Sequence, residues 1–161
     1  MYYYIFSGPV AAGKNTIAKL LANSVNKGVH IDVDELRRIV VHPHKAPWDG
    51  KKGKDQQLLA IKNSCLLAKQ FIKKGYSVTI TNLLDDKTAN LYKRLLKNFP
   101  FKIILFTPSF EEVKKRDIAR GQKLTDDEFK MLYQHQQELT IFDMKIDNTY
   151  LKPEEVVKKL I

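Results

Sequence analysis

The sequence predicts an α/β protein: a three-layer sandwich in which helices cover both faces of a five-stranded, mostly parallel β-sheet. Short apolar segments alternate along the chain with longer segments whose apolar residues recur at the helical period. The short segments lack period-two alternation and are rich in β-branched and aromatic residues, which is typical of parallel strands buried on both faces. This alternation indicates a doubly wound sheet, whose ligands bind at the carboxyl ends of the strands.

The elements follow one another in a regular order. The expected strands are residues 2–7, 28–32, 76–81, 101–107 and a weaker one at 144–146. The first three helical stripes are Ile17, Leu20, Leu21 and Val25, then Leu58, Ile61, Cys65, Ala68 and Ile72, then Leu91, Tyr92, Leu95, Leu96 and Phe99. Three later helices, expected at 109–120, 126–139 and 153–161, each begin with residues that suit a helix start.

The length of the chain fits one domain. It has 161 residues, 43% of them hydrophobic, against a usual ~100 to 200 residues per domain, so we expect a single domain over 1–161. The formal net charge of +10 is compatible with an anionic ligand or partner without identifying it. A single cysteine excludes an internal disulfide and favours a reducing, cytoplasmic setting. No apolar run approaches the ~20 residues that span a membrane, so we expect no membrane association.

The strongest motif is the segment GPVAAGKNT at residues 8–16, between the first expected strand and the first expected helix. Its Gly-x4-Gly-Lys spacing is that of a P-loop, in which backbone N–H groups and the helix N-terminus face phosphate oxygens and the lysine reaches the β and γ phosphates. A chance glycine-rich turn is the alternative, which the strand and helix on either side disfavour. The residues expected to bind nucleotide phosphates are Gly8, Ala11, Ala12, Gly13, Lys14, Asn15 and Thr16.

One position departs from the usual P-loop. The residue after the lysine is normally Ser or Thr, whose hydroxyl binds Mg²⁺, and here it is Asn15, followed by Thr16. Either the Asn15 amide oxygen or a water takes the metal position, or Thr16 supplies the ligand. The loop resembles that of adenylate kinases and related small P-loop kinases, some of which also lack this hydroxyl. The resemblance implies a P-loop NTPase fold of the nucleoside-monophosphate-kinase type, with ATP and Mg²⁺ as cofactors.

Two carboxylates, Asp32 and Asp34, follow the second expected strand. Asp-x-Asp at a strand end resembles the motif of shikimate and gluconate kinases, and the longer string resembles the kinase domain of polynucleotide kinase. These resemblances imply that Asp34 is the general base for the acceptor hydroxyl and that Asp32 holds magnesium waters. A carboxylate suits the proton-accepting role. Alternatively, Asp34 is the N-cap of the next helix, and the two roles are compatible.

Three further features are expected to border the acceptor. Arg37 either clamps an anionic or hydroxyl-rich acceptor or lies in solvent. The segment 42–54 is basic and irregular and is expected to be a mobile substrate loop. Asn82 ends the third expected strand, where related kinases often carry an aspartate, and its neutral amide is suited to orient an acceptor or a water. No Asn-Lys-x-Asp guanine signature occurs, which favours ATP over GTP.

Arg116 and Arg120 lie four residues apart and therefore on one face of the expected helix 109–120. The pair resembles the lid of the small-kinase superfamily, which implies that both arginines close over the transferring phosphoryl group. An ordinary ion pair between Glu112 and Arg116 is the alternative. Residues 147–157 resemble the loop that lies along the adenine ring in the same superfamily, where contacts are made by the backbone.

Together these features predict a kinase that moves the γ-phosphoryl group of MgATP to a hydroxyl acceptor, which is a small molecule or a nucleoside or nucleotide. The catalytic residues would be Lys14, Asp34, Arg116 and Arg120, with Thr16 and Asp32 at the metal and Asp34, Arg37 and Asn82 at the acceptor. Two alternatives stay open. The basic loop and net charge fit a kinase of 5′-hydroxyl nucleic-acid ends, and Asn15 and Asn82 fit an ATP-binding regulatory module that turns over slowly or not at all. The sequence leaves the oligomeric state open.

Overall fold

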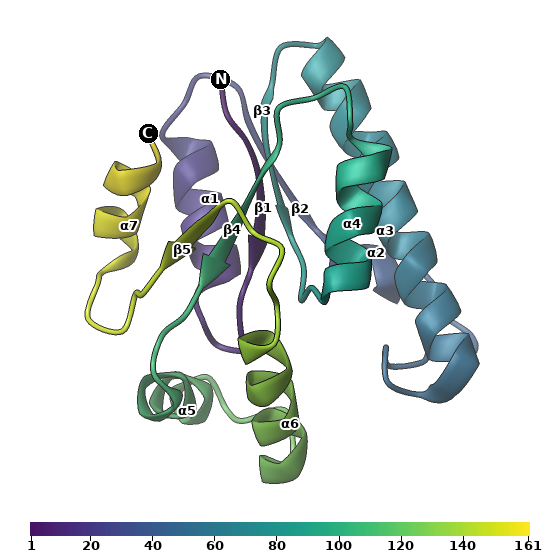
Figure 1. Ribbon diagram of the computed structural model, residues 1–161, viewed down its shortest axis with the longest axis vertical. Helices are drawn as coiled ribbons and strands as arrows, with labels where there is room; N and C mark the ends of the chain where they lie inside the picture. Colours follow the sequence, from purple (N-terminus) through teal and green to yellow (C-terminus); the bar gives the residue numbers. More distant parts are fainter.

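The computed structural model describes residues 1–161 as a sandwich of three layers, with a sheet between two layers of helices (Figure 1). The strands are β1 (Tyr3–Ser7), β2 (Gly28–Asp32), β3 (Ser77–Thr81), β4 (Lys102–Phe106) and β5 (Met144–Ile146). They lie in the order β2-β3-β1-β4-β5, and every neighbouring pair is parallel. The predicted fold class is confirmed, and the sheet is entirely parallel. The observed strand ends differ from the expected ones by one residue at most.

Helices cover both faces of the sheet. The first layer is formed by α1 (Lys14–Asn23) and α7 (Pro153–Leu160), and the second by α3 (Gly50–Lys73) and α4 (Asp86–Leu95), with the short α2 (Val33–Arg38) packed on α3. Each layer buries its own apolar cluster against the sheet. No helix has the length and apolar composition needed to cross a membrane.

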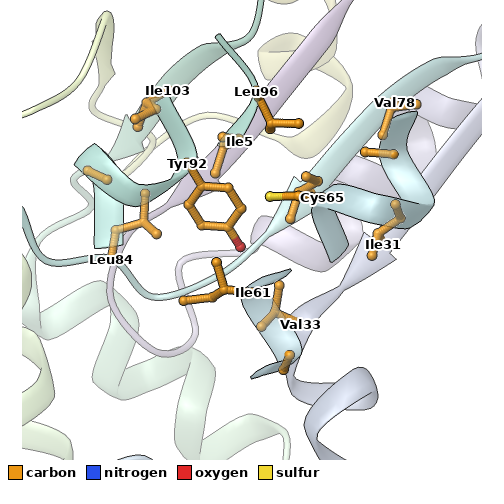
Figure 2. Close-up of a cluster of buried hydrophobic side chains, with 14 of the residues drawn as sticks. Ile5, Ile31, Val33, Ile61, Cys65, Val78, Leu84, Tyr92, Leu96 and Ile103 are labelled. Carbon is orange, nitrogen blue, oxygen red and sulfur yellow. The ribbon is translucent and has the colours of Figure 1, made fainter. Parts of the chain in front are cut away.

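The larger cluster lies beneath α3 and α4 and is centred on Tyr92, as Figure 2 shows. The Tyr92 ring is completely buried among Ile5, Ile61 and Leu96. Its hydroxyl lies within hydrogen-bond distance of Ser64 Oγ and accepts a hydrogen bond from Asn82 Nδ2, at 3.3 Å in each case. Tyr92 therefore connects the core to the end of β3, where the candidate site begins.

Two helices, α5 (Phe110–Ala119) and α6 (Asp126–Gln137), lie beyond the carboxyl edge of the sheet, at the bottom of Figure 1. The start of α5 and the end of α6 are both attached to the sheet or to the loops that follow its strands. Gln136 accepts a hydrogen bond from Ser7 Oγ at 2.7 Å and donates one to Leu84 O at 2.6 Å, while Ser109 N donates to Thr149 Oγ1 at 2.9 Å. The α5–α6 pair is thus a helical hairpin rooted in the sheet edge that carries the P-loop.

The segment expected to be irregular over 42–54 is only partly so. Helix α3 begins at Gly50, so residues 50–54 are helical and the prediction is wrong for them. The reason is a close backbone contact: a Cβ at Gly53 would lie 1.9 Å from Ala46 O. Glycine therefore lets the first turn of α3 pack directly on the preceding segment, and this tertiary contact outweighs the low helix propensity of two glycines.

Candidate active site

The P-loop has the backbone geometry of a phosphate cradle. Gly8, Ala11 and Gly13 have positive φ values of 145°, 63° and 86°. Glycine is required at position 8, because a Cβ there would lie 2.8 Å from Phe106 O. Gly13 is the N-cap of α1, whose first turn has neither an acidic residue nor a side-chain cap. The N-terminus of α1 is therefore open to an anion.

Lys14 lies across this loop. Its Nζ donates hydrogen bonds to Gly8 O at 2.7 Å and Pro9 O at 2.8 Å. Burial lowers the pKa of Lys14 to about 8, while Asp34 and Asp32 oppose this shift and the Arg120 guanidinium adds to it. Charged side chains from two distant parts of the sequence, the β2–α2 junction and the end of α5, thus act on one ammonium group.

Asp32 connects the P-loop to α2. Its Oδ1 accepts a hydrogen bond from Asp34 N at 2.9 Å, and its Oδ2 accepts one from Asn15 Nδ2 at 2.6 Å. The N-cap of α2 is therefore Asp32, and the alternative that assigned this role to Asp34 is wrong. The Asp34 carboxylate, 58% exposed and 3.6 Å from Arg37 Nη2, is left available at the mouth of the site.

The residues beside the P-loop fit a magnesium ion that is shared with nucleotide phosphates. No group of three or more His, Cys, Asp or Glu side chains converges anywhere in the chain. The exposed Thr16 hydroxyl would bind Mg²⁺ directly and the Asp32 carboxylate would bind its waters, which fits the few protein ligands that Mg²⁺ usually takes when phosphates and water supply the rest. Asn15 enters this set through its hydrogen bond to Asp32 rather than as a free amide.

Arg37 is 8% exposed, so the solvated alternative is wrong for it. Its Nη1 donates to Lys45 O at 2.7 Å and lies 3.1 Å from His44 Nε2, and its Nε has no protein partner. Arg37 therefore fixes the segment before α3 beside Asp34. The neighbouring Arg38 is exposed and paired with Glu35.

Asn82 is buried, and both its amide oxygen and its amide nitrogen are hydrogen-bonded within the protein. Its Oδ1 accepts from Gln57 Nε2 and from Leu83 N, both at 2.9 Å, and its Nδ2 donates to Tyr92. Gln57 of α3 is the residue that sequence reasoning missed, and its buried Oε1 has no protein partner. Nothing in the local sequence distinguishes Gln57 from Gln56, because only the packing of α3 decides which of them faces β3.

The two arginines of α5 make different contacts. Arg116 Nε donates to Glu112 Oε1 at 2.8 Å, so the expected ion pair is present, and its Nη2 donates to Asn148 O at 3.0 Å. Arg120 is bonded only to Asp117. Asn148, whose side chain we expected to be uninformative, donates from Nδ2 to Ala12 O at 2.8 Å and so attaches the terminal loop to the P-loop.

The whole chain superposes on solved kinase structures. A sugar kinase from Janibacter sp. matches with a TM-score of 0.71 and 16% identity over 99% of this chain and 92% of that one. A shikimate kinase from Aquifex aeolicus matches with a TM-score of 0.66 and 20% identity, over 98% of this chain and 93% of that one. A gluconokinase from Sinorhizobium meliloti matches with a TM-score of 0.66 and 15% identity, over 98% of this chain and 88% of that one. The chain has the P-loop kinase fold.

These similarities confirm the fold that the phosphate-loop motif predicted. No family model and no curated protein matches the sequence. Because the matching P-loop kinase structures share 20% identity or less with the chain, they establish the architecture around the site. The roles of individual residues depend on the contacts described above.

Proposed function

We propose that the protein is an ATP-dependent phosphotransferase that transfers the γ-phosphoryl group to a hydroxyl of a small molecule. The observation that carries the proposal is the P-loop geometry, in which Lys14 lies across the loop and Asn15 joins the loop to Asp32. Lys14 is influenced by Asp34 and Asp32 from the β2–α2 junction and by Arg120 from α5. A phosphate cradle faced by a carboxylate base and an arginine contains the parts that phosphoryl transfer requires.

The reaction follows from these positions. The P-loop N–H groups and Lys14 hold the β and γ phosphates, and the acceptor hydroxyl lies against Asp34. A bond forms between the acceptor oxygen and the γ phosphorus as the bond to the bridging β–γ oxygen breaks. The hydroxyl proton passes to Asp34, and ADP leaves. Magnesium, when bound beside Asp32 and Thr16, would neutralise part of the phosphate charge.

The acceptor side of the site supports a compact, polar molecule. Arg37 and Gln57 each have one buried polar atom without a protein partner, and both lie near Asp34 or Asn82. Such atoms are costly to bury unless a ligand or water completes their hydrogen bonds. Among the matching structures are a sugar kinase and a gluconokinase, which supports a small-molecule acceptor.

The test is transfer of labelled γ-phosphate from MgATP into two separate pools, one of small hydroxylated metabolites and one of 5′-hydroxyl oligonucleotides, with Lys14→Ala as the blank. We expect label in the metabolite pool. Asp34→Asn should lower the transfer rate at least ~10²-fold, because it removes the proton acceptor, and should affect nucleotide affinity much less. Asp55→Asn, an exposed position on α3, is the matched control.

Other outcomes would contradict the proposal in distinct ways. Label that moves only to the oligonucleotide pool would identify a nucleic-acid end kinase. Binding of ATP without transfer to either pool would favour a regulatory module. Unchanged transfer by Asp34→Asn would remove this residue from the role of base.

A further inference from the structure

Asp117 is the only acidic side chain that the fold buries completely. It lies in α5, outside the two apolar clusters that cover the sheet. Removing a carboxylate from water is costly unless a partner of opposite charge compensates for the lost hydration. The position of Asp117 therefore requires a partner, and the nature of that partner indicates its purpose.

That partner is Arg120. Arg120 Nε donates to Asp117 Oδ1 at 2.9 Å, and Arg120 Nη2 lies 2.8 Å from the same oxygen. The other carboxylate oxygen, Oδ2, is buried and has no protein partner. A guanidinium donates in fixed directions within one plane, so the Nε–H bond and the close Nη2 contact to a single oxygen fix both the place and the orientation of the Arg120 group.

The backbone around Arg120 does not hold its side chain. Arg120 is the C-cap of α5, and Gly121 follows with a φ of 92°, so the chain turns away at this point. The Arg120 side chain is 44% exposed, in contrast to the fully buried Asp117. The orientation of this exposed guanidinium therefore depends on one buried carboxylate a turn earlier in the helix.

The contacts of α5 connect the helix that ends before Arg120 to the P-loop. Arg116, one turn earlier on the same face, donates to Asn148 O, and Asn148 Nδ2 donates to Ala12 O. The charge of Arg120 also contributes to the lowered pKa of Lys14. Of the five N–H groups of the Arg120 guanidinium, only Nε–H is hydrogen-bonded within the protein, so N–H groups of the two Nη atoms are left for a ligand.

We propose that Asp117 is a positioning residue that holds Arg120 with N–H groups of its Nη atoms directed at the transferring phosphoryl group. The proposal rests on the phosphotransferase function proposed above. Asp117 takes no part in the bond changes and neither accepts nor releases a proton. Arg120 compensates the negative charge on the γ-phosphoryl oxygens while the bond to ADP breaks and the bond to the acceptor forms, and Asp117 keeps it aligned.

The first experiment measures the orientation of Arg120 without any turnover. In wild-type protein the Nε–H groups of Arg116 and Arg120 both donate to carboxylates, at 2.8 and 2.9 Å, so both should give dispersed, slowly exchanging NMR signals. Asp117→Asn should move the Arg120 signal to the position of a solvated arginine and leave the Arg116 signal in place. An unchanged Arg120 signal would overturn the proposal.

The second experiment is kinetic. Asp117→Asn should lower kcat about 10²-fold with little change in the KM for ATP. A misplaced Arg120 guanidinium would weaken mainly the interaction with the phosphoryl group in the transition state. Arg120→Ala should cost at least as much, and the double variant should equal Arg120→Ala alone. A double variant whose loss of kcat equals the product of the two single losses would overturn the proposal. Asp127→Asn, an exposed acid of α6, is the matched control and should leave kcat unchanged.

Two further comparisons keep the test decisive. If Asp117→Asn does not fold, Arg120→Lys retains the charge pair without the planar fork and should show the same loss of kcat, whereas wild-type kcat would overturn the proposal. If wild-type protein phosphorylates neither acceptor pool, the proposed function fails by itself. The NMR signal, and a fall of about tenfold in the preference for AMPPNP over ADP in Asp117→Asn, then decide whether Asp117 directs Arg120.

Discussion

Asn15 shows how one side chain can alter a phosphate loop without changing its shape. It occupies the position of the usual hydroxyl residue, and its amide nitrogen donates a 2.6 Å hydrogen bond to Asp32. The second oxygen of Asp32 accepts a bond from the α2 backbone. Both oxygens of the carboxylate that we propose to face the metal are therefore already engaged in hydrogen bonds.

We expect Asn15→Ser to increase the effect of magnesium on nucleotide binding. Serine would restore the usual hydroxyl ligand and free one oxygen of Asp32 for magnesium-bound water. The ratio of ADP dissociation constants without and with Mg²⁺, measured by titration calorimetry, should rise about tenfold.

The control for this change is Asn23→Ser, at the far end of α1 and exposed to solvent. It should leave the magnesium effect as in wild type. An equal effect in wild type and Asn15→Ser would show that the hydrogen bond between Asn15 and Asp32 does not influence metal binding.

The role of a single residue was predictable where a sequence motif includes it. It was not predictable where a tertiary contact determines the burial or the partners of the side chain. The P-loop lysine follows from motif spacing and the roles predicted for the two aspartates follow from a resemblance, yet the cap of α2 is Asp32, whereas we had considered this role only for Asp34. Asp117 stands in the charged run Lys-Lys-Arg-Asp, which is typical of a solvated helix face. Its burial depends on how α5 packs against the rest of the molecule, which no local pattern records.

Among the secondary-structure elements, order and type were predictable because each carries its own apolar period. All five strands appear where expected, as do the helices. The start of α3 was missed because glycines and lysines fill its first turn, and this composition is typical of a loop. The contact between Gly53 and Ala46 that makes the turn helical lies outside the helix itself.

Gly53→Ala should therefore destabilise the protein through α3. Its new Cβ would lie 1.9 Å from Ala46 O, so either the helix or the preceding segment must shift, at a cost of about 1 to 3 kcal/mol. Urea unfolding would measure this loss.

Gly75→Ala provides the comparison for this prediction. That position has a φ of 78° and nothing within 4 Å of a new Cβ, so only backbone strain of about 1 kcal/mol opposes the change. Equal losses for the two variants would show that the contact between Gly53 and Ala46 does not limit the packing of α3.

Across the whole molecule, the sheet order brings distant parts of the sequence to one edge. Strand β3 lies between β1 and β2, so the P-loop and the β2–α2 junction come from strands that do not touch. The side chains of Asn15 and Asp32 bridge this separation. A sequence motif predicts each part, but only the crossover connections place them together.

Asp86 joins α4 to the segment before β5 and should make stability depend on pH. The Thr140 hydroxyl and the backbone N–H groups of Thr140 and Ile141 donate to its carboxylate and lower its pKa, with the hydroxyl bond the largest cause. A carboxyl whose pKa is lower in the folded state stabilises the protein above its unfolded pKa of about 3.9. This contribution is lost as the pH falls through the folded value.

Asp86→Asn should accordingly lower the urea midpoint more at about pH 7 than at about pH 3, because part of the stabilisation by the Asp86 carboxylate is already lost below its unfolded pKa. The exposed Asp127→Asn is the control. A loss of the same size at both pH values would mean that the charge of Asp86 adds nothing to its hydrogen bonds.

The attachment of α5 and α6 at Ser109 and Gln136 determines how these helices can move. A hairpin rooted at both ends pivots like a flap about the line joining its roots, and its tip travels farthest. From Gln136 to Asp126 the helix axis runs about 15 Å, so a rotation of about 10° displaces the tip by roughly 3 Å. Arg120 lies near that tip, so a small angular change at the roots sets the distance between its guanidinium and a bound phosphate.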